Sequence, residues 1–157
     1  MIDLALPRAL HVAAVVHWIG GVSFVTLAML PGDRRIEAPE ARMRLFETLE
    51  RPFSRQAKIS VTLAGLTGVY MTEPLGAWNR VLDPGYWWMH AMALVWLTFT
   101  AVLFLLEPFV LHRWFAAAAA RDPEAVLRLV HRGHLVLLIV SAVTVAAAVL
   151  GAHGAIY

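Results

Sequence analysis

The chain contains no cysteine and carries little charge. Of its 157 residues only 15% are Asp, Glu, Lys or Arg, and Lys58 is the single lysine. The missing cysteine excludes disulfides, thiolate metal ligands and thiol catalysis. The sequence also holds no nucleophilic triad, no glycine-rich phosphate loop and no paired-carboxylate motif. Common hydrolytic and phosphate-transfer chemistries are therefore not predicted.

Apolar residues make up most of what remains. They account for 60% of the chain, and the mean hydropathy is +0.67, whereas a soluble domain is about half apolar and about a quarter charged. We therefore predict an all-α integral membrane protein that forms one transmembrane domain, residues 1–157. The net charge of +2 comes mostly from arginines in short connections, which set membrane topology more often than they bind nucleic acid.

Four apolar stretches approach or exceed the roughly 20 residues that a membrane-spanning helix needs. They predict a four-helix bundle embedded in a lipid bilayer, and a charged stretch after the first of them predicts an amphipathic connector on the membrane surface. The predicted helices cover about 9–30, 57–72, 86–111 and 134–156, and the connector covers about 38–53.

Arginine is unevenly distributed among the connections, which predicts the orientation. The first and third connections are rich in arginine, whereas the second has only Arg80. Positive charge marks the cytoplasmic side of a membrane. We therefore expect both termini on the outer, periplasmic side of a multi-pass protein in the inner (plasma) membrane.

Seven histidines in so apolar a chain are the main functional clue, because protonatable side chains in hydrocarbon are costly and indicate function. With the predicted topology, His11, His90 and His153 lie at one level, near the outer ends of three helices. His17 lies about 9 Å deeper than His11 and about 120° around the same helix, so it need not face the same way.

Two cofactors suit the outer histidines, although histidines that merely satisfy a backbone carbonyl are the plain alternative. Heme b is held by imidazole, and four-helix bundles build such sites from inward side chains. Gly21 and Gly68 would leave room for the flat macrocycle and Trp18 would form a wall. Copper(I) is the alternative, because thioethers and imidazole suit it. The methionines near the outer side are Met71, Met89 and Met92.

A second group of histidines lies near the cytoplasmic end, where interfacial histidines without a cofactor are common. Its members are candidate ligands of a second heme: His112, His131 and His134. Nearby, Glu107 precedes Pro108 inside an apolar helix. We expect this carboxylate to pair with a neighbouring cation, with proton relay as the alternative.

Two stretches resemble known membrane families. "ALHVAAVVHWIGGVSF" (9–24) is similar to the opening of copper-resistance D (CopD-like) proteins, and together with "GYWWMHAMALVW" (85–96) it resembles the HemJ-type protoporphyrinogen oxidases. The HemJ resemblance implies a compact four-helix heme b protein with His11 and His90 in the ligand positions. This chain has Met92 where the HemJ-type proteins have a lysine.

The leading hypothesis is a heme b-binding membrane protein for one-electron transfer, with a quinol or a periplasmic redox protein as partner. His11 is preferred to His17 as the helix-one ligand of the heme iron, His90 is the second ligand, and His153 is the next candidate. The alternatives are a CopD-like copper-handling protein and a HemJ-like oxidase, so a membrane oxidoreductase is one predicted class. A homo-oligomer or a subunit of a larger assembly is compatible with each.

Overall fold

The structure is a computed structural model that describes residues 4–32 and 38–156, without the side chains of 110–113 and 116. Within these ranges the regular structure is entirely helical and no strand occurs. The predicted all-α class is confirmed.

The first long segment runs without a break from Ala5 to Gly32. It comprises α1 (Ala5–Phe24), a π-helical turn η1 (Val25–Met29) and α2 (Leu30–Gly32). It includes the predicted 9–30 helix and extends beyond it at both ends. Buried Thr26, in the π-helical turn, donates its hydroxyl proton to the Val22 carbonyl at 2.6 Å. Threonine side chains often bond in this way to the carbonyl four residues earlier, and the bond tends to bend a helix.

The second segment corrects the sequence-based division. The predicted connector (38–53) and the predicted helix (57–72) form one helix of 34 residues, α3 (Pro39–Thr72), which continues through Pro52. A proline inside a helix costs about 3 kcal/mol, which favours a break there. The break does not occur because buried residues occupy one face on both sides of the proline: Met43, Phe46, Ala57, Val61 and Ala64.

The third segment begins with short turns and contains a π-helical stretch before its last α-helix. After α4 (Trp78–Val81) and a 3₁₀ turn, η3 (Pro84–Tyr86), come α5 (Trp87–Ala101), the π-helical η4 (Val102–Leu111) and α6 (His112–Ala119). The Asp83 side chain accepts a hydrogen bond from the Gly85 N–H at 2.8 Å, which fixes the entry. Pro108 lies inside η4, where its missing N–H interrupts the regular hydrogen-bond ladder.

The fourth segment, α7 (Pro123–Ala152), begins well before the predicted residue 134. Asp122 caps it by accepting a hydrogen bond from the Ala125 N–H at 2.8 Å, and Pro123 occupies the first turn, where proline is favoured. The charged first turns belong to the helix because Val126, Leu127 and Val130 are buried on its inner face.

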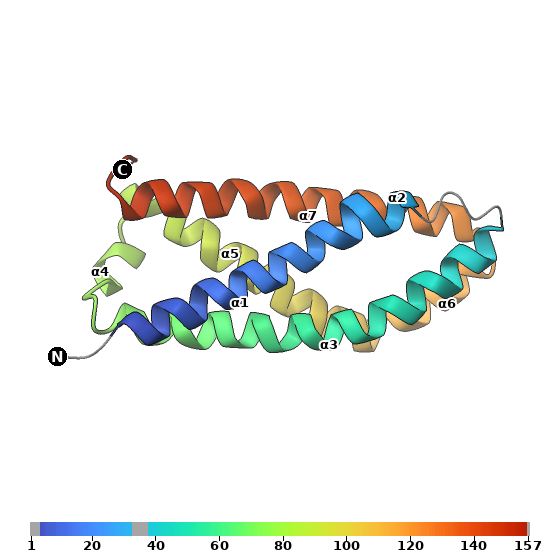
Figure 1. Ribbon diagram of the computed structural model, residues 1–157, viewed down its shortest axis with the longest axis horizontal. Helices are drawn as coiled ribbons and strands as arrows, with labels where there is room; N and C mark the ends of the chain where they lie inside the picture. The colour runs from blue at the N-terminus through green and yellow to red at the C-terminus, as the bar shows by residue number, and fades with distance from the viewer. Residues whose placement is uncertain (1–3, 33–37, 157) are drawn as a thin grey trace.

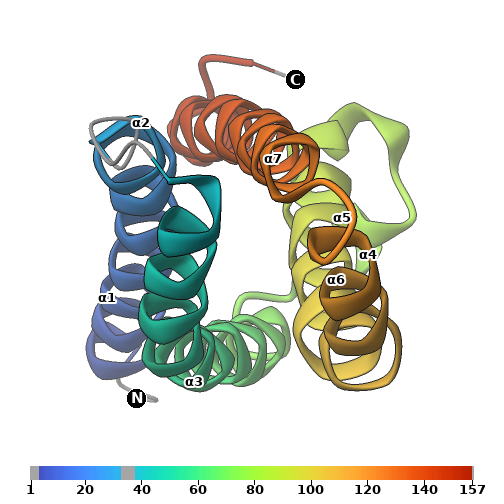
Figure 2. The ribbon, with the colours of Figure 1, turned by 90° about the vertical axis from the view of Figure 1, so that its right-hand side faces the viewer.

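The four long segments lie side by side, with α3 against α1 and α7 against α5 (Figures 1 and 2). The start of α1, the end of α7 and α4 lie at one end of the molecule, here called the α4 end. The α2 and α6 helices lie at the other, the α6 end (Figure 1). One buried cluster contains Trp18 and Val61, and another contains Phe46 and Leu127.

Within the described residues, three helical stretches are long and apolar enough to cross a membrane: Ala5–Gly32, Pro84–Phe109 and Pro123–Ala152. Much of their surface is exposed, including Val16, Leu94 and Val143. A contiguous apolar exterior of this kind matches a lipid surface. The chain therefore has the character of a multi-pass membrane protein.

Glycines mark the closest approaches between the segments. The Phe53 ring lies against Gly21, the Trp96 indole against Gly65 and the Trp88 indole against Gly151, each occupying the space that a Cβ atom would need. Trp96 also donates its Nε1 proton to the Val61 carbonyl at 2.9 Å. Small residues at such positions let helices pack closely in membranes.

Candidate functional site: the α1–α3 seam

His11 has a defined seat between α1 and α3. Its Nδ1 lies 2.9 Å from the Ala64 carbonyl and 3.1 Å from the Thr67 hydroxyl oxygen. The Gly68 backbone faces the ring, and a Cβ there would lie 3.3 Å from His11 Cε1. Gly68 therefore makes room for this imidazole, and we name the contact line of His11, His17, Ser60, Ala64 and Thr67 the α1–α3 seam.

The seat also fixes which ring nitrogen of neutral His11 carries the proton. A carbonyl oxygen can only accept a hydrogen bond, so Nδ1 donates to Ala64 and Nε2 keeps its lone pair. Metal-ligating histidines usually bind in this way, with one nitrogen tied to a carbonyl or carboxylate and the other turned to the metal. Nε2 of neutral His11 is therefore the ring atom that could hold a metal.

His17 reaches the same face of α3 one helical turn away. Its Nδ1 lies 2.9 Å from the Ser60 hydroxyl oxygen, and Ser60 precedes Ala64 by four residues. The two histidines therefore contact one stripe of α3, despite their separation around α1. Ser60 and Thr67 are both buried, and the sequence analysis did not identify either as a partner of the histidines.

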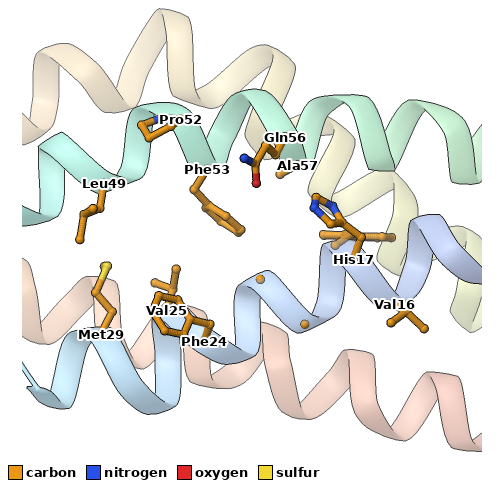
Figure 3. Close-up of a pocket in the computed structure, with 13 residues that line it drawn as sticks. Val16, His17, Phe24, Val25, Met29, Leu49, Pro52, Phe53, Gln56 and Ala57 are labelled. Carbon is orange, nitrogen blue, oxygen red and sulfur yellow. The ribbon is translucent and has the colours of Figure 1, made fainter.

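Next to His17 the seam opens into a groove of about 500 Å³ between α1 and α3. Figure 3 shows the His17 ring and the Gln56 amide directed into it, with Phe24 and Phe53 among the apolar walls. Trp18 also lines the groove. Trp18 is 4% exposed, and within the described residues its Nε1 has no hydrogen-bond partner.

The structure does not bring the other two outer histidines into this seam. His90 is exposed and its Nε2 donates to the Val81 carbonyl at 2.8 Å. His153 is exposed and its Nδ1 donates to the Val149 carbonyl of its own helix at 2.8 Å. Among residues 4–32 and 38–156, no group of three or more His, Asp or Glu side chains is arranged to hold a metal ion.

Side chains of the chain face the two glycines that the sequence analysis singled out. Phe53 lies on Gly21 and His11 lies on Gly68. The Trp18 ring meets Phe99 edge to face at 4.6 Å between centroids, so Trp18 packs between segments and also lines the groove.

The histidines at the α6 end are separated from the seam. His134 Nδ1 donates to the Val130 carbonyl at 3.0 Å. His131 lines a polar pocket together with Leu30, Arg42, Glu124, Leu127, Arg128 and Arg132. Arg42 donates to Glu124 at 2.7 Å across this pocket. The His112 side chain lies outside the described part of the structure.

A polar cluster joins α3 to η4, and sequence reasoning identified only one member of it. Glu107 accepts a hydrogen bond from the Ser54 hydroxyl at 2.6 Å and pairs with Lys58 at 3.2 Å. The expected pairing of Glu107 with a cation is therefore present, and the described partner is Lys58, the single lysine of the chain. The signal for this pair in the sequence was the single lysine of the chain together with a glutamate inside an apolar stretch.

Comparison with known proteins gives no match for this chain. It matches no protein-family model, no curated protein and no solved structure.

Proposed function

We propose that the protein crosses the membrane four times, binds heme b through His11 and transfers single electrons. The observation that carries this proposal is the seat of His11, whose Nδ1 is held by the Ala64 carbonyl against Gly68. The partner would be a quinol or a periplasmic redox protein. A place in a larger assembly remains compatible with this role.

The four-crossing topology is supported by the course of α3. This helix lies along α1, and its hydrogen bonds with His11 and His17 place residues 60–67 beside the apolar α1. A helix packed along a membrane-spanning segment for several turns shares its depth. The arginines and Lys58 of α3 lie between Arg42 and Lys58, before this stretch.

Charge supports the same orientation as the sequence predicted. Arg42, Arg121, Arg128 and Arg132 belong to helix starts and turns at the α6 end, whereas Arg80 belongs to α4. By the positive-inside tendency, the α6 end would face the cytoplasm and both termini the periplasm of the inner membrane.

The orientation can be tested directly because the chain has no cysteine. Single cysteines would replace two exposed residues, Asn79 in α4 and Ala117 in α6. A maleimide that cannot cross membranes should label N79C in intact spheroplasts and A117C only after lysis. Labelling of A117C in intact spheroplasts would overturn the orientation, and equal protection of both would overturn the four crossings.

The residues fit one axial ligand of a heme. His11 offers an unprotonated Nε2 and a fixed ring plane, and apolar residues line the helices around it. When bound, heme b supplies a one-electron redox centre whose potential depends on axial ligation and burial. The chain's own part is to orient the imidazole through Ala64 and Thr67 and to keep Nδ1 protonated.

A reduced-minus-oxidised visible spectrum of the purified protein tests this function. Wild type, expressed with ample heme, should show a Soret band and a sharp alpha band, and H11A should lose both. T98V is the matched control, because exposed Thr98 is not a candidate ligand and bonds only to the Leu94 carbonyl of its own helix. A folded, colourless wild-type protein would sink the proposal.

The second ligand is a separate question in the same experiment. The sequence predicts His90, whose Nε2 donates to Val81 and whose Nδ1 keeps the lone pair. If H90A converts a low-spin spectrum to a high-spin one, His90 is the second ligand. An unchanged spectrum would assign the iron to His11 without His90.

A further inference from the structure

We propose that the groove between α1 and α3 binds the ring of a membrane quinone, with its carbonyl oxygens at Gln56 and His17. The inference names the partner class and its place in the fold. It rests on the proposed membrane location of α1 and α3, and it does not depend on whether heme is bound.

His17 lies deep along an apolar helical segment. His17 lies about 18 Å along the helical segment from Ala5 and about 22 Å before Gly32, so it sits near the middle of an apolar candidate span. His17 is nevertheless exposed there, and exposed Gln56 lies one helical turn before its partner Ser60, toward the cytoplasmic side. Exposed polar side chains in the hydrocarbon core are rare and usually line a substrate path or cavity.

The depth of His17 in the membrane limits which ligands can reach it. The hydrocarbon core is about 30 Å thick, and the headgroups and ester carbonyls of phospholipids lie at its edges. A hydrogen-bonding site near the middle would be out of their reach. A quinone is an uncharged ring with two carbonyl acceptors and an apolar tail, and such a headgroup can enter the core.

The wall of the groove contains a buried hydrogen-bond donor. Trp18 lines the groove, and its buried Nε1–H has no partner within the described residues. An indole N–H can only donate, and leaving such a group unpaired in an apolar site is costly. The Gln56 amide, directed into the groove in Figure 3, is the donor that a ligand carrying acceptors can reach directly, and the Trp18 N–H lies buried in a residue of the same wall.

The shape of the groove agrees with this chemistry. Its volume of about 500 Å³ is in the range of ordinary ligand sites, which combine apolar walls with a few polar groups. Phe24, Phe53 and Met29 supply apolar walls, while His17 and Gln56 supply the polar groups (Figure 3). The Ser60 hydroxyl lies 2.9 Å from His17 Nδ1. When Ser60 donates to Nδ1, Nε2 carries the ring proton and can donate it to a carbonyl oxygen.

Gly20 provides a steric test of the site. It lines the groove, and a Cβ added there would meet no atom within 4 Å. The backbone therefore accommodates a Cβ at position 20, and a leucine there would add bulk at the wall of the groove. Gly133 on α7 is the matched control, because it also has open space and does not line the groove.

The experiment uses the full chain in lipid nanodiscs and a photoreactive azido-quinone, with cross-linked peptides identified by mass spectrometry. In the wild type, cross-links should map to residues 16–29 and 49–57, and excess decylubiquinone should suppress them. G20L should weaken the apparent affinity by roughly tenfold or more. Q56L should weaken it by roughly threefold to tenfold, the loss expected for one hydrogen bond, and G133L should leave it unchanged.

Three results would overturn the inference. These are cross-linking in G20L equal to that in the wild type, cross-links confined to other segments, and suppression by decanol as effective as by decylubiquinone. The last would mean that the groove holds any alkyl chain. The result is distinguishable from that for heme, because cross-linking needs no visible spectrum: a colourless protein that binds quinone loses only the heme proposal.

Discussion

The α1–α3 seam and the α5–α7 seam of this bundle are built differently. Across the first, His11 and His17 make hydrogen bonds to α3. Across the second, the Trp88 indole lies directly on Gly151, and its Nε1 finds no partner within the described residues. The histidines of α1 bond to the facing helix, whereas His90 bonds to the Val81 carbonyl and His153 to a carbonyl of α7. The first seam is therefore held partly by polar contacts and the second by packing on a glycine.

The difference shows that the depth of a histidine does not decide its role. His11, His90 and His153 lie toward the same end of the molecule, yet among the described hydrogen bonds only that of His11 reaches another long helix. The neighbour matters because α3 offers at the same height a glycine and a carbonyl that accepts a further hydrogen bond. The following predictions test this contrast, beginning with the largest expected effect.

The two seams are tied together by the Glu107–Lys58 pair, whose side chains are 26% and 29% exposed. We expect K58M to lower the free energy of unfolding by about 2 to 4 kcal/mol, because it leaves a partly buried carboxylate without its cation. Denaturant titration of the purified protein in detergent measures this. The double variant K58M/E107Q should recover much of the loss, and a double variant no more stable than K58M would contradict the pairing.

Overpacking should break the α5–α7 seam. G151V places methyl groups where the Trp88 indole lies, so we expect a loss of about 1 to 3 kcal/mol and a lower Tm. G133V adds the same side chain to α7 in open space and is the control. Equal Tm values for the two variants would show that Trp88 does not seat on Gly151.

The hydrogen bonds of the α1–α3 seam should contribute less than this packing. Interhelical hydrogen bonds in membranes are worth about 0.6 kcal/mol on average and at most about 1.7, so S60A should lower stability within that range. T98V is the matched control, because exposed Thr98 bonds only to the Leu94 carbonyl of its own helix. A loss in T98V as large as in S60A would remove the distinction between the seams.

The smallest effect is expected on the exposed side of the bundle. H153A removes a side chain whose hydrogen bond stays within α7, and exposed substitutions of this kind usually change stability by less than about 0.5 kcal/mol. The Tm in detergent should therefore be close to that of the wild type. A large decrease would indicate that His153 makes contacts absent from the single chain.

Much of the architecture could be predicted from the sequence because hydropathy and breakers act locally. The apolar runs at 9–30 and 86–111 each fall in a continuous helical segment, and the run at 134–156 is helical as far as Ala152, where α7 ends four residues before the prediction. Asp83-Pro84-Gly85 marks a turn because its own side chain and backbone close it. The α3 helix could not be divided correctly, since the burial that carries it through Pro52 comes from other segments.

The sequence by itself determined that the chain is helical, apolar on its exterior and free of thiol chemistry, because these follow from composition and local pattern. Only the tertiary structure decided which polar side chains meet. Three such contacts join residues that are far apart in the sequence. The separations are 53 residues for His11 and Ala64, 43 for His17 and Ser60, and 49 for Glu107 and Lys58. Their meeting depends on the rotation of each helix and on small residues that let it approach, and neither is specified by spacing along one helix.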